Sequence, residues 1–176
     1  SNGTCFTIAS NNVNLDCDGF SIFYDANGTG GDGVVAVGRT NVTVKNCIIR
    51  DINASGSGGV GINFATMNNS FIINNTILTN GTSSNNGIQL ISSSNNNSVN
   101  NNNITTGGSL NSNIGIYLTV SGNNITNNKV STSGTSDNHG ILLRNSANNN
   151  SVSNNNIMTG GSSNNNYGIF LLTTVS

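Results

Sequence analysis

The sequence predicts an all-β fold in which one chain winds into a solenoid of about six coils, each of about 25–29 residues. Three observations lead to this fold class. A short motif recurs at a nearly constant interval, apolar and polar residues alternate within each repeat, and residues that favour turns separate the apolar runs. A single repeat is too small to bury its apolar face alone, so the repeats have to stack on one another.

The recurring motif consists of a glycine, an aliphatic residue, any residue and a second apolar residue. It begins at Gly61, Gly87, Gly115, Gly140 and Gly168, and related stretches begin at Cys5 and Gly33. These starting points lie 28, 28, 26, 28, 25 and 28 residues apart. A second marker, Thr-x-Gly followed by Ser or Thr, keeps the same order and begins at Thr79, Thr106, Thr132 and Thr159. Regularity of this kind is typical of a repeat architecture.

Each repeat offers about three short strands. Val42 and Val44, like Ile88 and Leu90, alternate with polar residues, which is the period of a strand with one buried face. We expect each strand to pair in parallel with its equivalent one coil away, so that the aliphatic side chains form continuous interior columns. The column formed by the motif should contain Ile62, Ile88, Ile116, Ile141 and Ile169.

Asparagine is the most abundant residue, with 40 of the 176 positions, and Ser, Gly and Thr add 24, 22 and 18. Asn tolerates left-handed backbone conformations, and its amide can bond the Asn of the coil above or below. The asparagines are therefore expected at the corners between strands.

Three parts of the chain resemble the right-handed parallel β-helix repeat proteins: residues 41–48, the repeated Gly-Ile-x-Leu motif and the run 149–155. The opening residues 3–19 are similar to the N-terminal coils of secreted archaeal and bacterial members, including the NosD-like group. The resemblance implies a single-stranded, right-handed parallel β-helix that occupies residues 1–176 as one domain. It implies little about function, because this architecture hosts lyases, hydrolases, adhesins and inert spacers.

Charge and hydropathy exclude two classes of partner. The chain has 5 Lys and Arg against 6 Asp and no Glu, for a net charge of -1. Binding of nucleic acid or of an anionic membrane surface needs a basic stripe, which is missing. No apolar run reaches even about ten residues, so we expect no membrane-spanning helix.

Acidic residues concentrate in the first two coils. Asp16, Asp18, Asp25, Asp32 and Asp51 lie there, and only Asp137 lies beyond. Cleavage of a polysaccharide needs a pair of carboxylates. Asp16 and Asp18 suit a turn, whereas Asp25, Asp32 and Asp51 could approach one another across adjacent coils and would then suit a weak calcium site. His139 follows Asp137 closely, but no activated Ser or Cys can be placed beside it. We expect no catalytic residue, no cofactor and no metal site.

Cys5, Cys17 and Cys47 all lie in the first quarter of the chain. Cys17 and Cys47 fall at nearly equivalent positions of consecutive coils, where stacked backbones are close enough for a disulfide. This predicts a Cys17–Cys47 bridge, with Cys5 unpaired or bonded outside the chain. The alternative is that all three are small buried residues in reduced form.

Eleven asparagines stand in Asn-x-Ser/Thr sequons, close to the number, about 9.5, that this composition gives by chance. Asn27, Asn53 and Asn80 are the best candidates for glycosylation, because they are expected in the longest loops.

These observations favour a non-catalytic structural protein of the cell surface or extracellular space, such as a filament subunit, a stalk or an adhesin-type solenoid. The alternative is a carbohydrate-binding or polysaccharide-cleaving β-helix with its site on the first two coils. The chain starts with Ser and has no leader, so it is expected to be a processed chain or a segment of a longer one. Neither end carries a recognisable cap, and residues 171–176 resemble an interrupted coil. The expected partners are a second copy, stacked head-to-tail through the end coils, and surface glycans.

Overall fold

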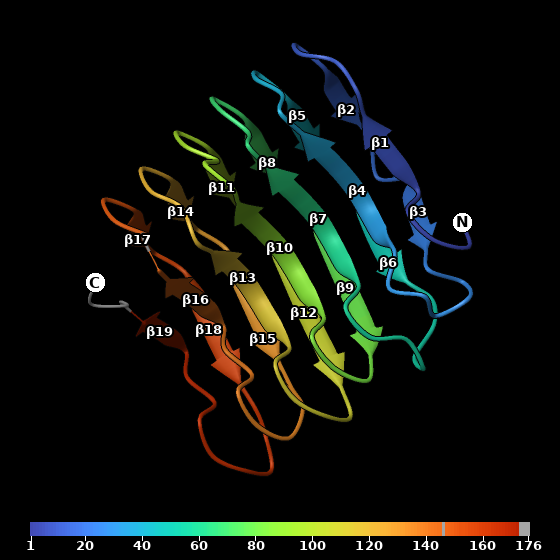
Figure 1. Cartoon of the computed structure of the whole chain (residues 1–176), viewed down its shortest axis with the longest axis vertical. Helices are drawn as coiled ribbons and strands as arrows, with labels where there is room; N and C mark the ends of the chain where they lie inside the picture. The colour runs from blue at the N-terminus through green and yellow to red at the C-terminus, as the bar shows by residue number, and fades with distance from the viewer. Residues whose placement is uncertain (146, 173–176) are drawn as a thin grey trace.

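The structure, a computed structural model, describes residues 1–145 and 147–172. Its nineteen strands form three parallel sheets, A, B and C, and the described residues contain no helix (Figure 1). Each coil contributes one strand to each sheet in turn. The fold is therefore the predicted all-β solenoid of about six coils. Residues 173–176, part of the stretch expected to be an interrupted coil, lie outside the described residues.

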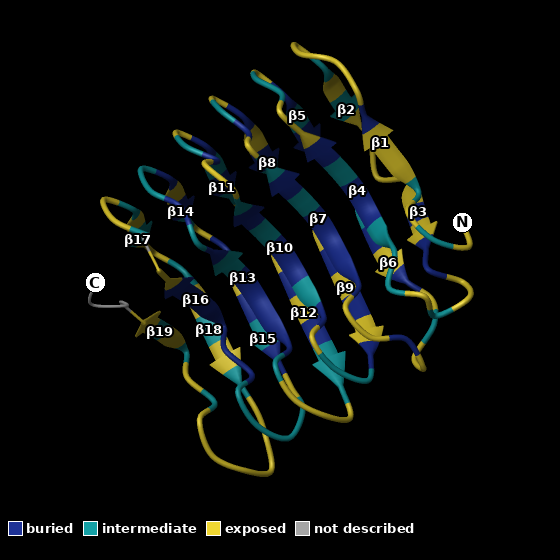
Figure 2. Ribbon diagram, in the orientation of Figure 1, coloured by how far each residue is buried: buried dark blue, intermediate teal, exposed yellow. Residues whose placement is uncertain are grey.

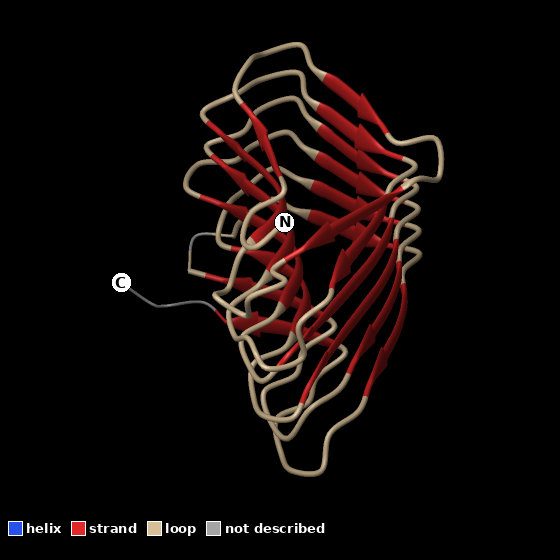
Figure 3. Cartoon of the chain, turned by 90° about the vertical axis from the view of Figure 1, so that its right-hand side faces the viewer, coloured by secondary structure: helices blue, strands red, loops and turns tan. Residues whose placement is uncertain are grey.

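Sheet A has seven strands: β1 (Phe6–Ile8), β4 (Asp32–Val37), β7 (Val60–Ala65), β10 (Asn86–Ile91), β13 (Ile114–Leu118), β16 (Ile141–Arg144) and β19 (Ile169–Leu172). Sheet B has six: β2 (Asn14–Asp16), β5 (Thr43–Lys45), β8 (Phe71–Ile73), β11 (Ser98–Asn100), β14 (Asn124–Thr126) and β17 (Ser151–Ser153). Sheet C has six: β3 (Ser21–Tyr24), β6 (Ile48–Asp51), β9 (Thr76–Gly81), β12 (Asn103–Gly108), β15 (Lys129–Thr132) and β18 (Asn156–Thr159). Seen from the side, equivalent strands of successive coils follow one another with the same outline (Figure 3).

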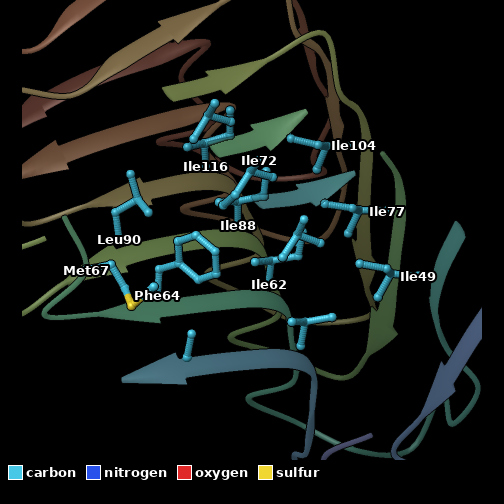
Figure 4. Close-up of a cluster of buried hydrophobic side chains, with 14 of the residues drawn as sticks. Ile49, Ile62, Phe64, Met67, Ile72, Ile77, Ile88, Leu90, Ile104 and Ile116 are labelled. Carbon is cyan, nitrogen blue, oxygen red and sulfur yellow. The ribbon is translucent and has the colours of Figure 1, made fainter. Parts of the chain in front are cut away.

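The predicted interior column is confirmed by the register of sheet A. Ile88 pairs with Ile62 on one side and with Ile116 on the other, and the column continues through Ile141 to Ile169. Figure 4 shows Ile62, Ile88 and Ile116 in this column beside a second column of Ile49, Ile77 and Ile104. Ile169 keeps the register but is 49% exposed, because β19 is the last strand of its sheet.

Glycines of the motif lie where successive coils of sheet A approach one another and sheet C closely. A Cβ atom at Gly87 would overlap Cγ2 of Ile104 and lie 2.6 Å from the carbonyl oxygen of Gly115. The space towards the interior is therefore already filled, and the following residue, Ile88, also points inwards. Only Gly allows the backbone of successive coils and the isoleucine column of sheet C to come this close.

Asparagines occupy two kinds of position, of which the sequence predicted one. The expected corner positions, between sheets B and C, are left-handed, with φ of 54–58° at Asn46, Asn74, Asn101, Asn127 and Asn154. The residue that follows each of the last four of these corners is a second asparagine, which points into the interior and forms a ladder there. The residue that follows Asn46 is Cys47, which forms the disulfide. The assignment of asparagine to corners alone was therefore incomplete.

Three interior ladders run along the stack. In ladder 2 (Asn75, Asn102, Asn128 and Asn155), each Nδ2 donates to Oδ1 of the next member at 3.0 Å. The same Oδ1 atoms accept the backbone N–H of the preceding member at 2.9–3.0 Å. Ladder 1 (Ser70, Asn97, Asn123 and Asn150) and ladder 3 (Asn85, Asn113, Asn138 and Asn166) repeat this pattern. The ladders satisfy polar groups that burial would otherwise leave without partners.

Burial is greatest in the middle coils and falls towards both ends of the stack (Figure 2). The first coil exposes Phe6 and Phe20, and the last exposes Ile169 and Leu171. No helix in the described part of the chain is long and apolar enough to cross a membrane.

Candidate functional site

Three of the five acidic residues of the first two coils, Asp25, Asp32 and Asp51, gather at the junction of sheets C and A. Tyr24 ends β3 and pairs with Asp51, which ends β6, and Asp32 begins β4. Asp25 follows Tyr24 directly. Tyr24, Asp25 and Asp51 are 0%, 1% and 5% exposed. We call these four residues the acidic cluster.

Each carboxylate of the acidic cluster accepts hydrogen bonds from its surroundings. Asp25 Oδ1 accepts from the backbone N–H of Thr29 at 2.8 Å and of Gly30 at 3.1 Å. Asp51 Oδ1 accepts from Asn53 N–H at 2.9 Å. Asp32 Oδ2 accepts from Asn63 Nδ2 at 3.0 Å. The bonds to Asp25 and Asp51 anchor the loops that join sheet C to sheet A, and the bond to Asp32 links strands β4 and β7.

Burial and like charges shift the protonation of the cluster. Burial, with a smaller contribution from the neighbouring Asp25 charge, raises the pKa of Asp51 to about 6, against hydrogen bonds from Asn53 and Asn80 that lower it. Burial also raises the pKa of Asp32. The pKa of Tyr24 rises because of burial and the nearby negative charges, and its hydroxyl is one of the buried polar atoms without a hydrogen-bond partner. The only ion pair among residues 1–145 and 147–172 joins Lys45 to Asp16, so no paired cation offsets the cluster.

Proximity of Asp25, Asp32 and Asp51 was predicted, and all three influence Tyr24 electrostatically. However, no group of three or more His, Cys, Asp or Glu side chains within the described ranges is placed so that it could hold a metal ion. The three carboxylates are therefore not placed as a shared set of calcium ligands. Chemically, the cluster offers a proton-binding carboxyl, Asp51, beside a second carboxyl, Asp25.

Asp16 and Asp18 form a turn. The N–H of Asp18, which has a φ of 46°, donates to Asp16 Oδ1 at 3.1 Å. Asp16 also accepts from Asn46 Nδ2 at 2.9 Å and pairs with Lys45 Nζ at 3.1 Å. The hydrogen bond from Asn46 is the main reason that the pKa of Asp16 lies below its usual value. These contacts join the first coil to the second.

The disulfide lies beside this turn. Cys17 and Cys47 are bonded across the first two coils with a Cα–Cα distance of 4.7 Å, and Cys5 is free and partly buried. The cross-link closes a loop of 30 residues.

His139 belongs to an aromatic cluster at the other end of the stack. Its ring stacks on Tyr167 at a centroid distance of 5.6 Å and lies 4.9 Å from Phe170. Its Nδ1 accepts from the N–H of Tyr167 at 3.4 Å, and it is only 4% exposed. Burial lowers its pKa, partly opposed by Asp137, whose Oδ2 accepts from the Ser136 hydroxyl at 3.1 Å. The histidine therefore serves packing between the last two coils.

The glycosylation candidates differ in accessibility. Asn27 is exposed in the loop between β3 and β4. Asn53 is partly buried, and its Nδ2 donates to Ala26 O at 3.0 Å. Asn80 is exposed but lies within β9, so its placement in a loop was wrong; the strand extends there because Asn80 pairs with Gly107 of the next coil.

The sequence did not reveal the roles of two residues, Tyr24 in the acidic cluster and Phe170 in the aromatic cluster around His139. Tyr24 was not among the candidate residues, although the charges of all three carboxylates of the acidic cluster act on it. Phe170 was recognised only as part of a repeat motif. In each case the alternation of apolar and polar residues indicated on which face of its strand the side chain lies. It did not indicate which side chains of other coils lie beside it.

A family model described as "Right handed beta helix region" matches residues 1–176. No curated protein and no solved structure matches the chain. The family match covers the whole stack and carries no activity with it.

Proposed function

Because the chain belongs to the right-handed β-helix family, whose fold leaves function open, we propose that it is a non-catalytic structural protein of the cell surface or extracellular space. One observation carries the proposal. Ladder 2 bonds every coil from the third to the sixth to its neighbour through buried amides at 2.9–3.0 Å. The polar side chains of ladder 2 thus support the stacking of the coils.

The other polar groups support the same role. Five of the six aspartates accept hydrogen bonds that hold the chain together. Those to Asp16, Asp25, Asp51 and Asp137 hold turns or loops, and the one to Asp32 links β4 to β7. His139 is buried between aromatic rings. A stalk or filament subunit needs this kind of rigid, nearly uncharged rod.

An extracellular location is supported by the disulfide, because such bonds persist in oxidising compartments. In that setting Asn27 and Asn80 are the proposed glycosylation positions, since both are exposed. Asn53 is a poorer acceptor, because a glycan on Nδ2 would have to displace its bond to Ala26.

A second candidate function is binding or cleavage of a polysaccharide at the acidic cluster. It is favoured by one observation: the pKa of Asp51 is raised to about 6, in the range of a general acid, and Asp25 is close enough to contribute. Surface glycans would then be the substrate or ligand.

The test is to incubate the full chain with neutral and acidic polysaccharides and to measure new reducing ends. We expect none above the level of an Asp25→Asn, Asp51→Asn double variant, which keeps the side-chain carbonyl oxygens of both sites. Cleavage by the unchanged chain that the double variant loses would overturn the structural role and support the second candidate. Glycan binding without cleavage, abolished in the double variant, would support a binding module instead.

We also propose that a second copy of the chain is a partner, stacked head-to-tail through the end coils. The outermost described strands of every sheet have one unpaired edge, and an open parallel edge can accept another strand. Apolar side chains such as Phe6 and Ile169 are exposed beside these edges.

A further inference from the structure

The interior ladders have a direction. Every ladder asparagine except Asn85 bonds back to the coil before it: Asn102 Nδ2 donates to Ile72 O at 2.9 Å, and Asn102 Oδ1 accepts from Asn75 N–H at 2.9 Å. Ladder 1 shows the same sense, since Asn123 Nδ2 donates to Ser94 O at 2.9 Å and Asn123 Oδ1 accepts from Asn97 N–H. The backbone N–H of each member is therefore satisfied by the side chain of the following coil.

The last described coil ends all three ladders with an unused donor. Asn150, Asn155 and Asn166 bond back to the preceding coil through their side chains. Among the described residues, no acceptor meets the backbone N–H of these three asparagines, although every earlier asparagine of each ladder has one. We call the surface that carries these donors the C-terminal face.

The opposite end of the stack is built differently. The positions equivalent to Asn150, Asn155 and Asn166 are Val13, Cys17 and Gly3 in the first coil and Val42, Cys47 and Gly31 in the second. None of these has a side-chain carbonyl oxygen. The first coil of a second copy, placed on the C-terminal face, would therefore leave the three donors buried without an acceptor.

We infer that the C-terminal face is an interaction surface for a parallel β-solenoid coil that carries asparagine at the three ladder positions. Such a coil supplies three side-chain oxygens at the required places and continues the aliphatic columns that end at Val152, Ile157 and Ile169. Complementarity of the three oxygens to the three N–H groups selects it over an apolar coil, because a buried donor without an acceptor is costly. The inference goes beyond the structural role, since it states which chemistry the face accepts.

The test extends the full chain by one coil. A copy of residues 149–172 fused after Ser176 keeps the repeat in phase, because residue 176 follows residue 148 by 28 residues, the spacing that separates Ile141 from Ile169. A matched fusion changes the three ladder asparagines of the added copy to alanine. A third fusion adds residues 12–37, the first coil, with its cysteine changed to alanine.

Amide hydrogen exchange of Asn150, Asn155 and Asn166 is the measurement, and slow exchange at Ile116 and Ile141 shows that each fusion is folded. We expect exchange at the three asparagines to slow about tenfold or more in the first fusion relative to the other two. Equal protection by the alanine coil or by the first-coil copy would overturn the inference, because any coil would then suffice. Absence of protection in the first fusion would overturn it as well.

Discussion

Burial raises the pKa of the Asp51 carboxyl and hydrogen bonds lower it, and the effect of burial is the larger. The side chain occupies a position that Thr79, Thr106 and Thr132 occupy in later coils, but it brings a carboxyl group into the interior. Its pKa in the folded chain is about 6, against about 3.9 for an unfolded Asp. The folded state therefore binds a proton more tightly than the unfolded state.

The first prediction concerns pH. Because the folded pKa is raised, the contribution of Asp51 favours folding below about pH 4 and is lost as the pH rises through about 6. The shift of about 2 units corresponds to roughly 3 kcal/mol of unfolding free energy. Asp51→Asn, which keeps an oxygen for the Asn53 N–H, should therefore be more stable than the unchanged chain at pH 7.5. Urea unfolding at pH 4.5 and 7.5 measures the difference.

Asp32 should contribute in the same direction, since burial raises its pKa too. The comparison is therefore between the two chains at each pH, and not between pH values in one chain. Equal stability of Asp51→Asn and the unchanged chain at pH 7.5 would show that the buried carboxylate costs nothing.

The second prediction concerns the interior ladder. Asn102→Ala removes the acceptor of the Asn75 N–H and the donors to Ile72 and Asn128, all within the buried interior. We expect a loss of about 2–5 kcal/mol in the free energy of urea unfolding. Asn103→Ala, one residue away on the exposed face, is the control and should change stability by less than about 0.5 kcal/mol. Similar losses for the two variants would contradict a structural role of the ladder.

Adjacent asparagines illustrate what a sequence hides at this scale. Asn74 and Asn75 are identical in type, yet one has a φ of 56° at a corner and the other is buried in ladder 2. The preference of Asn for turns predicted the first position correctly. The second depends on hydrogen bonds to Val44 and Asn102, one coil to either side, which no local preference encodes.

At the scale of elements, the close approach of successive coils in sheet A depends on a row of glycines. The third prediction is that Gly87→Ala costs about 2–4 kcal/mol of unfolding free energy, because the added Cβ meets Ile104 and the backbone of Gly115. Gly107→Ala is the control, since its Cβ would meet only Ser133 Oγ at 3.5 Å, an ordinary contact. Urea unfolding compares them, and a Gly87 variant as stable as the control would contradict the tight approach of the coils.

The fourth prediction concerns the cross-linked coils. Closing a loop of 30 residues should stabilise the chain by about 3–4 kcal/mol. Reduction in a Cys5→Ser background, which prevents exchange with the free thiol, should speed amide exchange in β1 to β3 more than in β10 to β12. Exchange that accelerates equally in all coils would indicate that the disulfide supports the whole stack.

The elements were predictable from sequence to the extent that they repeat. The sheet A column was confirmed through Ile88 and its neighbours because their spacing alone sets the register. The cluster around Tyr24 was not, because the first coil departs from the repeat: Asp16 pairs with Lys45 and Ser21 with Ile48, so this coil holds two extra residues at its corner. Spacing also could not reveal that β9 continues past Thr79 into Asn80.

At the scale of the whole molecule, the two ends of the stack are both apolar but differ in hydrogen-bonding groups. The fifth prediction is that head-to-tail association of copies is weak in sedimentation equilibrium and insensitive to ionic strength, because the net charge is only -1. Val13→Asn should strengthen it, since the new amide can reach the N–H of Asn150 on the neighbouring copy.

Val13→Ala is the matched control, because it changes the same side chain without adding an acceptor. Stronger association of the alanine variant than of the asparagine variant would mean that the contact depends on apolar fit alone. Strong association of the unchanged chain would show that the three donors do not limit stacking.

The backward direction of the ladders also bears on how the chain is made. Asn102, for example, donates from Nδ2 to both neighbouring coils, but its Oδ1 and one of its Nδ2 hydrogen bonds use the coil before it. These backward partners are already in place when a polypeptide is made from its N-terminus. The first two coils use valines, glycines and a cross-link at these positions, so they need no earlier template. The molecule is thus suited to vectorial folding: the cross-linked coils form a seed, and each later coil is laid down on the one before it as it appears.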